Sequence, residues 1–162
     1  MFVNSRIYRF FILTFASGGG AGYFPVASGT FSTLIPGIPL YLLVAGLPPV
    51  WYLGFLILFI VFSIAISTEA DLLLREKDSH KIVIDEFCGF LVTMMFIPLN
   101  IYTIAAGFIL FRFFDIGKFQ PAKWVEDKLP GGASVTLDDV IAGIYSNILL
   151  RIGILVWENY SK

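Results

Sequence analysis

The sequence contains long stretches that carry no charge at all. No charged residue occurs between Arg9 and Glu69, and none occurs between Glu86 and Arg112. Charged residues make up 14% of the chain and hydrophobic residues 57%, whereas an average soluble domain has about 25% charged residues. This pattern predicts a small integral membrane protein with a single domain over residues 1–162. It excludes a disordered chain, an ordinary soluble domain and a nucleic-acid-binding protein with a basic face.

Helix-breaking residues divide the uncharged stretches. A transmembrane helix needs about 20 apolar residues, so the first stretch is too long for a single crossing. The sequence GLPP at 46–49 interrupts it because consecutive prolines cannot continue a helix, and PLN at 98–100 interrupts the second stretch. We therefore predict an all-α, polytopic membrane bundle with four or five short crossings and a further interfacial or core helix over 7–16. The predicted crossings fall at about residues 33–46, 50–68, 82–97, 100–116 and 138–157.

The charged residues form islands that five crossings would place on one side of the membrane. These islands cover residues 1–32, 69–81 and 117–137. Nine of the eleven Lys and Arg residues lie in or border this side, as do eleven of the twelve acidic residues. Because positively charged loops remain in the cytoplasm, we predict a multi-pass protein whose functional face points to the cytoplasm.

Carboxylates concentrate where three predicted helices meet this face. Asp85 and Glu86 begin one helix, Asp115 lies near the end of the next, and Asp138 and Asp139 begin the last. A carboxylate near the hydrocarbon is costly and usually has a functional reason. Oxygen ligands gathered at one depth favour Mg²⁺. Helix capping by Asp138, with solvated interfacial charge at the other positions, is the alternative interpretation.

Cationic and glycine-rich segments accompany these carboxylates. Arg112, Asp115 and Lys118 recur every three residues and share roughly one helix face, which suits a phosphate beside a metal because guanidinium binds phosphate bidentately. An internal salt-bridge ladder would use the same spacing. The loop GGGAGYFPVASGT (18–30) could present backbone N–H groups to a phosphate, or serve as a flexible loop at the membrane. Thr30 could add a hydroxyl there or cap a helix.

Few other groups are available for nucleophilic chemistry. The only histidine, His80, is expected to be a solvated loop residue. Cys88 is followed six residues later by Met94, where a cysteine phosphatase needs arginine, and no G-x-S-x-G elbow is present. The chemistry then falls to metal-activated water or to a carboxylate. A small ion-coupled transporter that uses helix-end carboxylates is the alternative function, although no inverted repeat is visible.

Four sequence blocks are specific in combination. They are GYFPVASGTFSTL (22–34), KDSHKIVIDEFCGFLVTM (77–94), AAGFILFRFFDIGKFQP (105–121) and GGASVTLDDVIAGI (131–144). In this order they resemble the blocks of the phosphatidylglycerophosphatase A family. The resemblance implies a Mg²⁺-dependent enzyme of the bacterial inner membrane. Such an enzyme removes the terminal phosphate from phosphatidylglycerophosphate during phospholipid synthesis.

The resemblance and the residue pattern together assign roles within the blocks. The expected metal ligands are Asp85, Glu86, Asp115, Asp138 and Asp139. The expected catalytic residues are Asp85, Glu86, Asp115, Lys118 and Asp139. The groups expected to hold the substrate phosphate are Gly29, Thr30, Arg112 and Lys118. One acidic residue would act as a base toward water or attack the phosphorus directly. The expected partners are the phospholipid substrate and membrane lipid, without nucleic acid.

Overall fold

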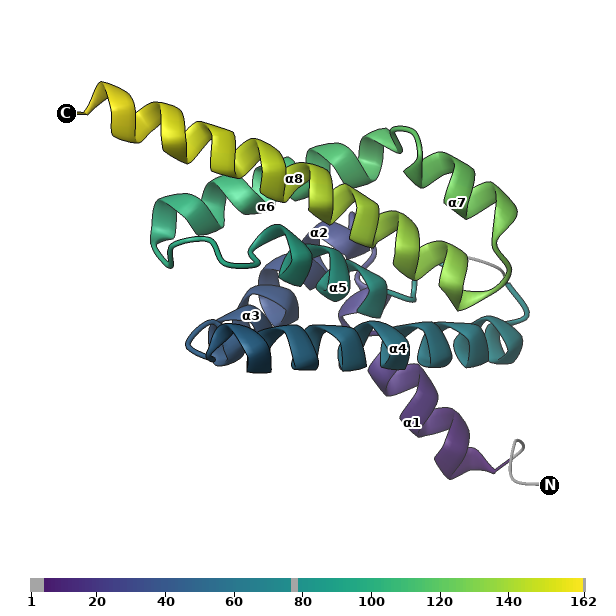
Figure 1. Ribbon diagram of the computed structural model, residues 1–162. Helices are drawn as coiled ribbons and strands as arrows, with labels where there is room; N and C mark the ends of the chain where they lie inside the picture. Colours follow the sequence, from purple (N-terminus) through teal and green to yellow (C-terminus); the bar gives the residue numbers. More distant parts are fainter. Residues whose placement is uncertain (1–4, 77–78, 162) are drawn as a thin grey trace.

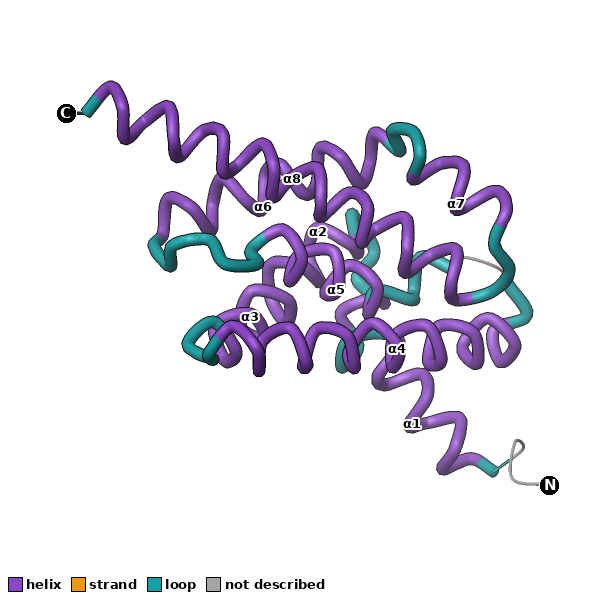
Figure 2. Tube along the Cα trace, viewed as in Figure 1, coloured by secondary structure: helices purple, strands orange, loops and turns teal. Residues whose placement is uncertain are grey.

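The described part of the chain is helical throughout. The computed structural model describes residues 5–76 and 79–161, and within these ranges it contains helices and loops but no strand (Figures 1 and 2). Lys77 and Asp78 of the second block lie outside the described residues. The main helices are α1 (Arg6–Ala16), α4 (Pro49–Leu74), α5 (Ile84–Thr93), α6 (Ile101–Gly117) and α8 (Gly132–Tyr160). Shorter ones are η1 (Ala21–Tyr23), α2 (Ser28–Ser32), π-helical η2 (Thr33–Gly37), α3 (Ile38–Val44) and α7 (Ala122–Lys128). The all-α prediction is confirmed.

Two of the described helices, α4 and α8, are long and apolar enough to cross a membrane. Their 26 and 29 residues correspond to lengths of about 39 and 44 Å. Both expose many large apolar side chains, including Leu58 at 73% and Leu155 at 60%, as expected for a surface in contact with lipid. The finer count of four or five crossings stays a prediction.

Helix α4 extends beyond its predicted end at residue 68, because its last turns pack against the amino-terminal helix. The hydroxyl of Tyr8 in α1 donates a hydrogen bond to Glu69 at 2.8 Å, and Ala70 is fully buried. The sequence predicts an interfacial or core helix over 7–16, and α1 exposes Phe10 and Phe11 on one face and buries Ile12 and Ala16 on another.

Helix α8 begins six residues earlier than predicted, at Gly132. The backbone N–H of Gly132 donates a hydrogen bond to the Thr68 hydroxyl at 3.0 Å. A side chain at Gly132 would collide with the backbone of Ile64 and Thr68, so glycine allows the start of α8 to lie directly on α4. The prediction that the last helix begins near residue 138 is therefore wrong.

The short helix α5 lies at the centre of the bundle. Nine of its ten residues are buried, and it packs against α4, α6 and α8. Gly89 of α5 and Gly143 of α8 allow the two backbones to meet, since a side chain on Gly143 would collide with the Gly89 carbonyl oxygen. Small residues serve the same purpose where membrane helices cross closely. Helix α5 ends at Thr93, four residues before the predicted end of its helix.

Polar side chains of α8 bind the carbonyl groups at the end of α5. From Thr93 the chain reaches α6 through the segment 94–100, which contains no helix, and such backbone within a membrane must find partners inside the protein. The Asn147 amide donates to the carbonyls of Thr93 and Met95 at 2.8 and 3.0 Å. Arg151 donates to the Met95 carbonyl at 2.8 Å. Arg151, the one charged residue within 140–157, thus stabilises the irregular segment 94–100.

The connections place four helix ends on one side of the bundle. Helix α4 ends there, α6 ends there, and both α5 and α8 begin there (Figure 1). The opposite side receives the start of α4, the start of α6 and the end of α8 (Figure 1). The family blocks around Asp85, Asp115 and Asp139 therefore converge on one end of the molecule.

The contact between Gly89 and Gly143 can be tested by mutation. Gly143→Ala should push α8 away from α5 and lower the melting temperature in detergent by about 3–10 °C, because overpacking costs about 1–3 kcal/mol. Gly153→Ala is a matched control on the same helix, since no described atom lies within 4 Å of the added carbon. Equal melting temperatures for the two variants would contradict the close helix crossing.

Candidate active site

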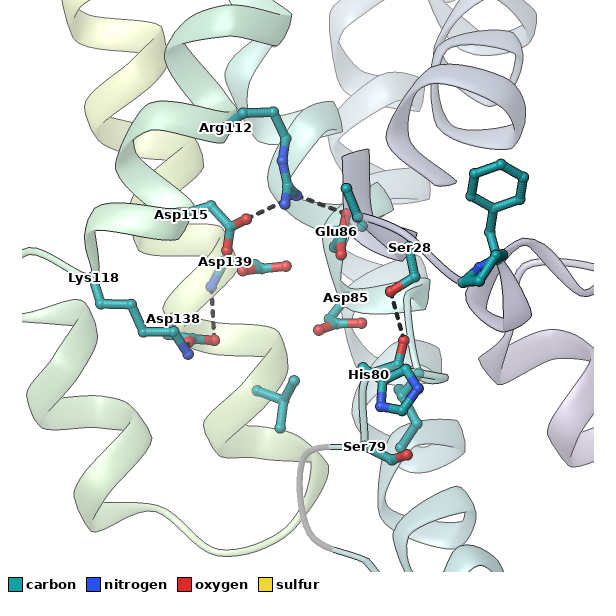
Figure 3. A pocket seen from close by; sticks show the side chains of 16 residues that line it. Ser28, Ser79, His80, Asp85, Glu86, Arg112, Asp115, Lys118, Asp138 and Asp139 are labelled. Atoms are coloured by element: carbon teal, nitrogen blue, oxygen red, sulfur yellow. Dashed lines mark hydrogen bonds and ion pairs between the residues drawn. The ribbon is translucent and has the colours of Figure 1, made fainter. Parts of the chain in front are cut away.

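A polar cavity of about 450 Å³ opens where these helix ends meet (Figure 3). The cavity is lined by eight of the nine residues predicted for the site: Gly29, Asp85, Glu86, Arg112, Asp115, Lys118, Asp138 and Asp139. The ninth, Thr30, is half-buried on α2 and does not line the cavity. Residues that are far apart in the sequence therefore share one site.

Asp138 and Asp139 lie inside the protein, about two turns along α8. Only 5% and 4% of their surfaces are exposed. The amino-terminal cap of α8 is Gly131, so helix capping does not explain Asp138. The two carboxylates belong to residues within α8, past its first turn, and they face the cavity (Figure 3).

Arg112 of α6 makes two ion pairs, of which the one with Glu86 joins α6 to α5. One of its terminal nitrogens, Nη1, lies 2.8 Å from Glu86 Oε2 and 2.8 Å from Asp115 Oδ2. The Arg112–Asp115 pair is the first step of the predicted salt-bridge ladder. Lys118 departs from that ladder, because its Nζ lies 3.2 Å from Asp138 Oδ2 on α8. The cations thus connect three helices around the cavity.

Glu86 is surrounded by donors from the amino-terminal segment. Its Oε2 accepts hydrogen bonds from the hydroxyls of Thr33 at 2.9 Å and Ser32 at 3.3 Å, in addition to the Arg112 ion pair. A side chain at Gly29 would collide with this carboxylate. Glu86 therefore fixes Arg112 and α2 in place.

Asp85 and Asp139 point into the space between the Arg112–Asp115 and Lys118–Asp138 pairs (Figure 3). Asp139 Oδ2 is buried and has no hydrogen-bond partner among the described residues. Such an oxygen is costly unless a donor or cation satisfies it. Within the described ranges, no group of three or more His, Cys, Asp or Glu side chains is arranged to hold a metal ion by itself. That some of the five predicted carboxylates hold one or two Mg²⁺ ions stays a prediction.

The cavity also contains residues that the sequence did not indicate. Ser28, Ser79 and His80 line it, and the Ser28 hydroxyl donates to the His80 carbonyl at 2.8 Å. His80 is exposed, as expected for a loop residue, but it lies on the cavity wall. The sequence did contain a signal for this placement, because His80 lies five residues before Asp85 in the same block. This hydrogen bond links the glycine-rich loop to the loop before α5.

An apolar helical bundle with two helices long enough to cross a membrane, and with cations and carboxylates recessed at one end, is typical of a membrane-associated protein with a polar site. The family model for phosphatidylglycerophosphatase A matches residues 14–154. The chain therefore belongs to the phosphatidylglycerophosphatase A family, as its sequence blocks predict. No solved structure matches the chain.

Named relatives align over most of the chain. Phosphatidylglycerophosphatase A of Escherichia coli is 35% identical over 144 residues, which cover 85% of this chain and 81% of that protein. Phosphatidylglycerophosphatase A of Haemophilus influenzae is 34% identical over 136 residues, which cover 83% of each. A candidate phosphatidylinositol-3-phosphatase of Bacteroides thetaiotaomicron is 31% identical over 142 residues, covering 84% and 89%.

Removal of the Glu86 carboxylate tests its structural part in the site. Glu86→Ala should destabilise the protein by about 1–2 kcal/mol, because it removes an acceptor shared by Arg112, Ser32 and Thr33, which then depend on Asp115 and the Gly29 carbonyl. Glu86→Gln should cost less, since the amide oxygen still accepts from Ser32 and Thr33. The measurement is thermal unfolding in detergent, with Glu158→Ala, at an exposed position, as a control. A melting curve for Glu86→Ala that matches this control would refute the assignment.

Proposed function

We propose that this protein is a Mg²⁺-dependent phosphatidylglycerophosphatase that releases the terminal phosphate of phosphatidylglycerophosphate in bacterial phospholipid synthesis. The observation that carries this proposal is the convergence of Arg112, Lys118 and the buried carboxylates on one cavity. Two relatives that cover more than four fifths of the chain are named phosphatidylglycerophosphatase A. No comparison favours the transporter alternative.

The donor set fits a magnesium ion. Mg²⁺ in phosphate-transferring sites is held by one or two carboxylates, by water and by the substrate phosphate, so a cluster of three acids is not required. The buried, unpartnered Asp139 Oδ2 is a suitable ligand, with Asp85 beside it and with Asp115 and Asp138 on the same cavity wall. Bound there, Mg²⁺ supplies positive charge to the phosphate and to a bound water. Glu86 is better suited to holding Arg112 than to holding the metal.

The cations of the cavity would bind the phosphate oxygens. Arg112 Nε is buried without a hydrogen-bond partner among the described residues, so the guanidinium retains a donor beyond its two ion pairs. The Lys118 side chain is 37% exposed and can move between Asp138 and an incoming phosphate. Gly29 lies on the same wall, whereas Thr30 does not and is less well placed. Fixed cations of this kind stabilise the charge that develops in phosphoryl transfer.

A carboxylate must then either take a proton from water or attack the phosphorus. Where Asp85 holds the metal ion, Asp139 is well placed for either role, because it is buried in the site and no hydroxyl, amide or guanidinium donates to its Oδ2 among the described residues. Asp115 is committed to Arg112, and Asp138 to Lys118. A base within hydrogen-bond reach of the attacking water is the usual requirement for such chemistry.

We further propose that the protein crosses the inner membrane several times, with its cavity at the cytoplasmic face. Trp51, Tyr102 and Trp157 lie near the helix ends opposite the cavity and are 71%, 83% and 73% exposed. Exposed Trp and Tyr are typical of the membrane–water interface. These aromatic residues mark one interface, and the basic islands around the cavity mark the cytoplasmic one.

Substitution of the central carboxylates tests the catalytic proposal. Asp139→Asn and Asp85→Asn should lower Mg²⁺-dependent phosphate release from phosphatidylglycerophosphate in detergent by about 10²-fold or more, and chelation of Mg²⁺ should abolish release by the unmodified enzyme. Lys123→Gln, at an exposed position on α7 that lines neither the cavity nor the hollows between α6 and α8, should remain fully active. Phosphatidic acid and lysophosphatidic acid complete the substrate panel. If both Asp variants turn over at the normal rate, the carboxylate site is wrong.

Cysteine labelling tests the sidedness. In a background with Cys88→Ala, Lys123→Cys on α7 should react with a membrane-impermeant maleimide only after the cells are permeabilised. Leu47→Cys should react in intact spheroplasts. Both positions are exposed, so each reports access instead of burial. The reverse labelling pattern would overturn the proposed orientation.

A further inference from the structure

An apolar groove follows the contact between α6 and α8. It consists of two hollows of about 330 and 870 Å³ that share the lining residue Leu149. The first hollow is lined by Phe114 and Tyr145, and the second by Leu110 and Ile154. Because the two hollows share a wall, we treat them as one feature, the α6–α8 groove.

The groove leads to the cavity along both helices. On α6, residues at intervals of four pass from Ala106 and Leu110 in the far hollow to Phe114 in the near hollow. Side chains spaced in this way form one continuous row on a helix surface. Lys118, the left-handed residue that follows the end of α6, lines the cavity. The groove therefore ends at a cation of the proposed phosphate site.

The second helix has a matching row. On α8, Asp138 lines the cavity and Tyr145, Leu149 and Ile152 follow at intervals of seven, four and three residues, which keep them on one face. The ion pair between Lys118 and Asp138, at 3.2 Å, connects the two rows at the head of the groove. The polar site and the apolar groove are thus consecutive parts of one interhelical surface.

The length of the groove suits a hydrocarbon chain. From Phe114 to Ala106, both of which line it, α6 rises by about 12 Å. The hydrocarbon core of a bilayer is about 30 Å thick, so one leaflet, and hence one acyl chain, extends over about half of that. A phospholipid monoester combines an anionic head with such a chain in the order in which the cavity and groove occur.

We propose that the α6–α8 groove binds one acyl chain of the phospholipid whose phosphate enters the cavity. This inference rests on the proposed phosphatase function for the identity of the head group. The order of cation, aromatic wall and aliphatic wall along the two helices selects this occupant over a water-soluble phosphate, which would fill the cavity alone. A bulk membrane lipid or a second copy of this chain would fill the groove without using Lys118.

Obstruction of the groove is the main test. Leu149→Trp places a larger side chain where the two hollows join. It should lower kcat/KM for dioleoyl phosphatidylglycerophosphate about tenfold, because a displaced chain misplaces the phosphate. For a dibutyryl substrate with the same head group, whose chains are too short to reach Leu149, kcat/KM should stay within twofold. Ile144→Trp is the matched control, since Ile144 lies on the same helix, is equally exposed at 43%, and does not line the groove.

A second variant tests the depth of the bound chain. Gly153 lines the far hollow, and a side chain there meets no described atom within 4 Å. Gly153→Phe should impair hydrolysis of the dioleoyl substrate but not of a dioctanoyl substrate. Gly54→Phe, an equally open position on α4, should impair neither. Equal effects on every chain length, or no effect of both groove variants on the dioleoyl substrate, would overturn the proposal.

Photolabelling tests whether an acyl chain occupies the α6–α8 groove, independently of catalytic turnover. A phosphatidic acid with a diazirine in the middle of its acyl chain should label peptides from α6 and α8, and Leu149→Trp should suppress this labelling. Equal labelling by a diazirine phosphatidylcholine would show a bulk-lipid site, and disulfide-linked dimers of Leu149→Cys would show a contact between copies. Either result rejects the proposal.

Failure of the proposed function can be told apart from failure of the groove assignment. If the wild-type enzyme releases no phosphate from any phosphatidylglycerophosphate while the α6–α8 labelling is specific, the proposed function fails and the groove assignment stands.

Discussion

The close contact between α5 and α8 determines the arrangement of the rest of the molecule. Because Gly89 and Gly143 let the two backbones meet, a helix of only ten residues can lie buried at the centre. The same contact brings Asp85 of α5 opposite Asp139 of α8, and it places Asn147 where it can bind the carbonyls that α5 leaves open. One crossing of small residues thus creates both the polar site and the internal support for the irregular chain that follows it.

The ion pairs around the cavity explain how so many charges are stable at one end of an apolar bundle. Arg112 and Lys118 each neutralise a carboxylate on another helix, Glu86 and Asp138 respectively. A buried ion pair contributes little net stability but is costly to break, so these pairs act mainly by fixing the relative positions of α5, α6 and α8. The unpartnered oxygen of Asp139 takes part in none of these ion pairs, which is why we propose Asp139 as the group that acts on the ligand.

Much of this arrangement could be predicted from the sequence, because charge-free stretches of the right length must alternate across the bundle. That rule alone brings Asp85, Asp115 and Asp139 to one end. The start of α8 could not be predicted, since it depends on the contact of Gly132 with Thr68, a residue 64 positions away. Nor could local spacing reveal that Lys118 pairs across to Asp138 of α8.

Because Gly29 has no side chain, it limits which mutations this site can accept. The Glu86 carboxylate fills the space in which any larger residue at position 29 would lie, and the same carboxylate holds Arg112. A substitution at position 29 is therefore tolerable only after the acid at position 86 has been shortened or moved, which in turn loosens the arginine. The two positions are epistatic, and the glycine-rich loop and the charged helix must evolve together.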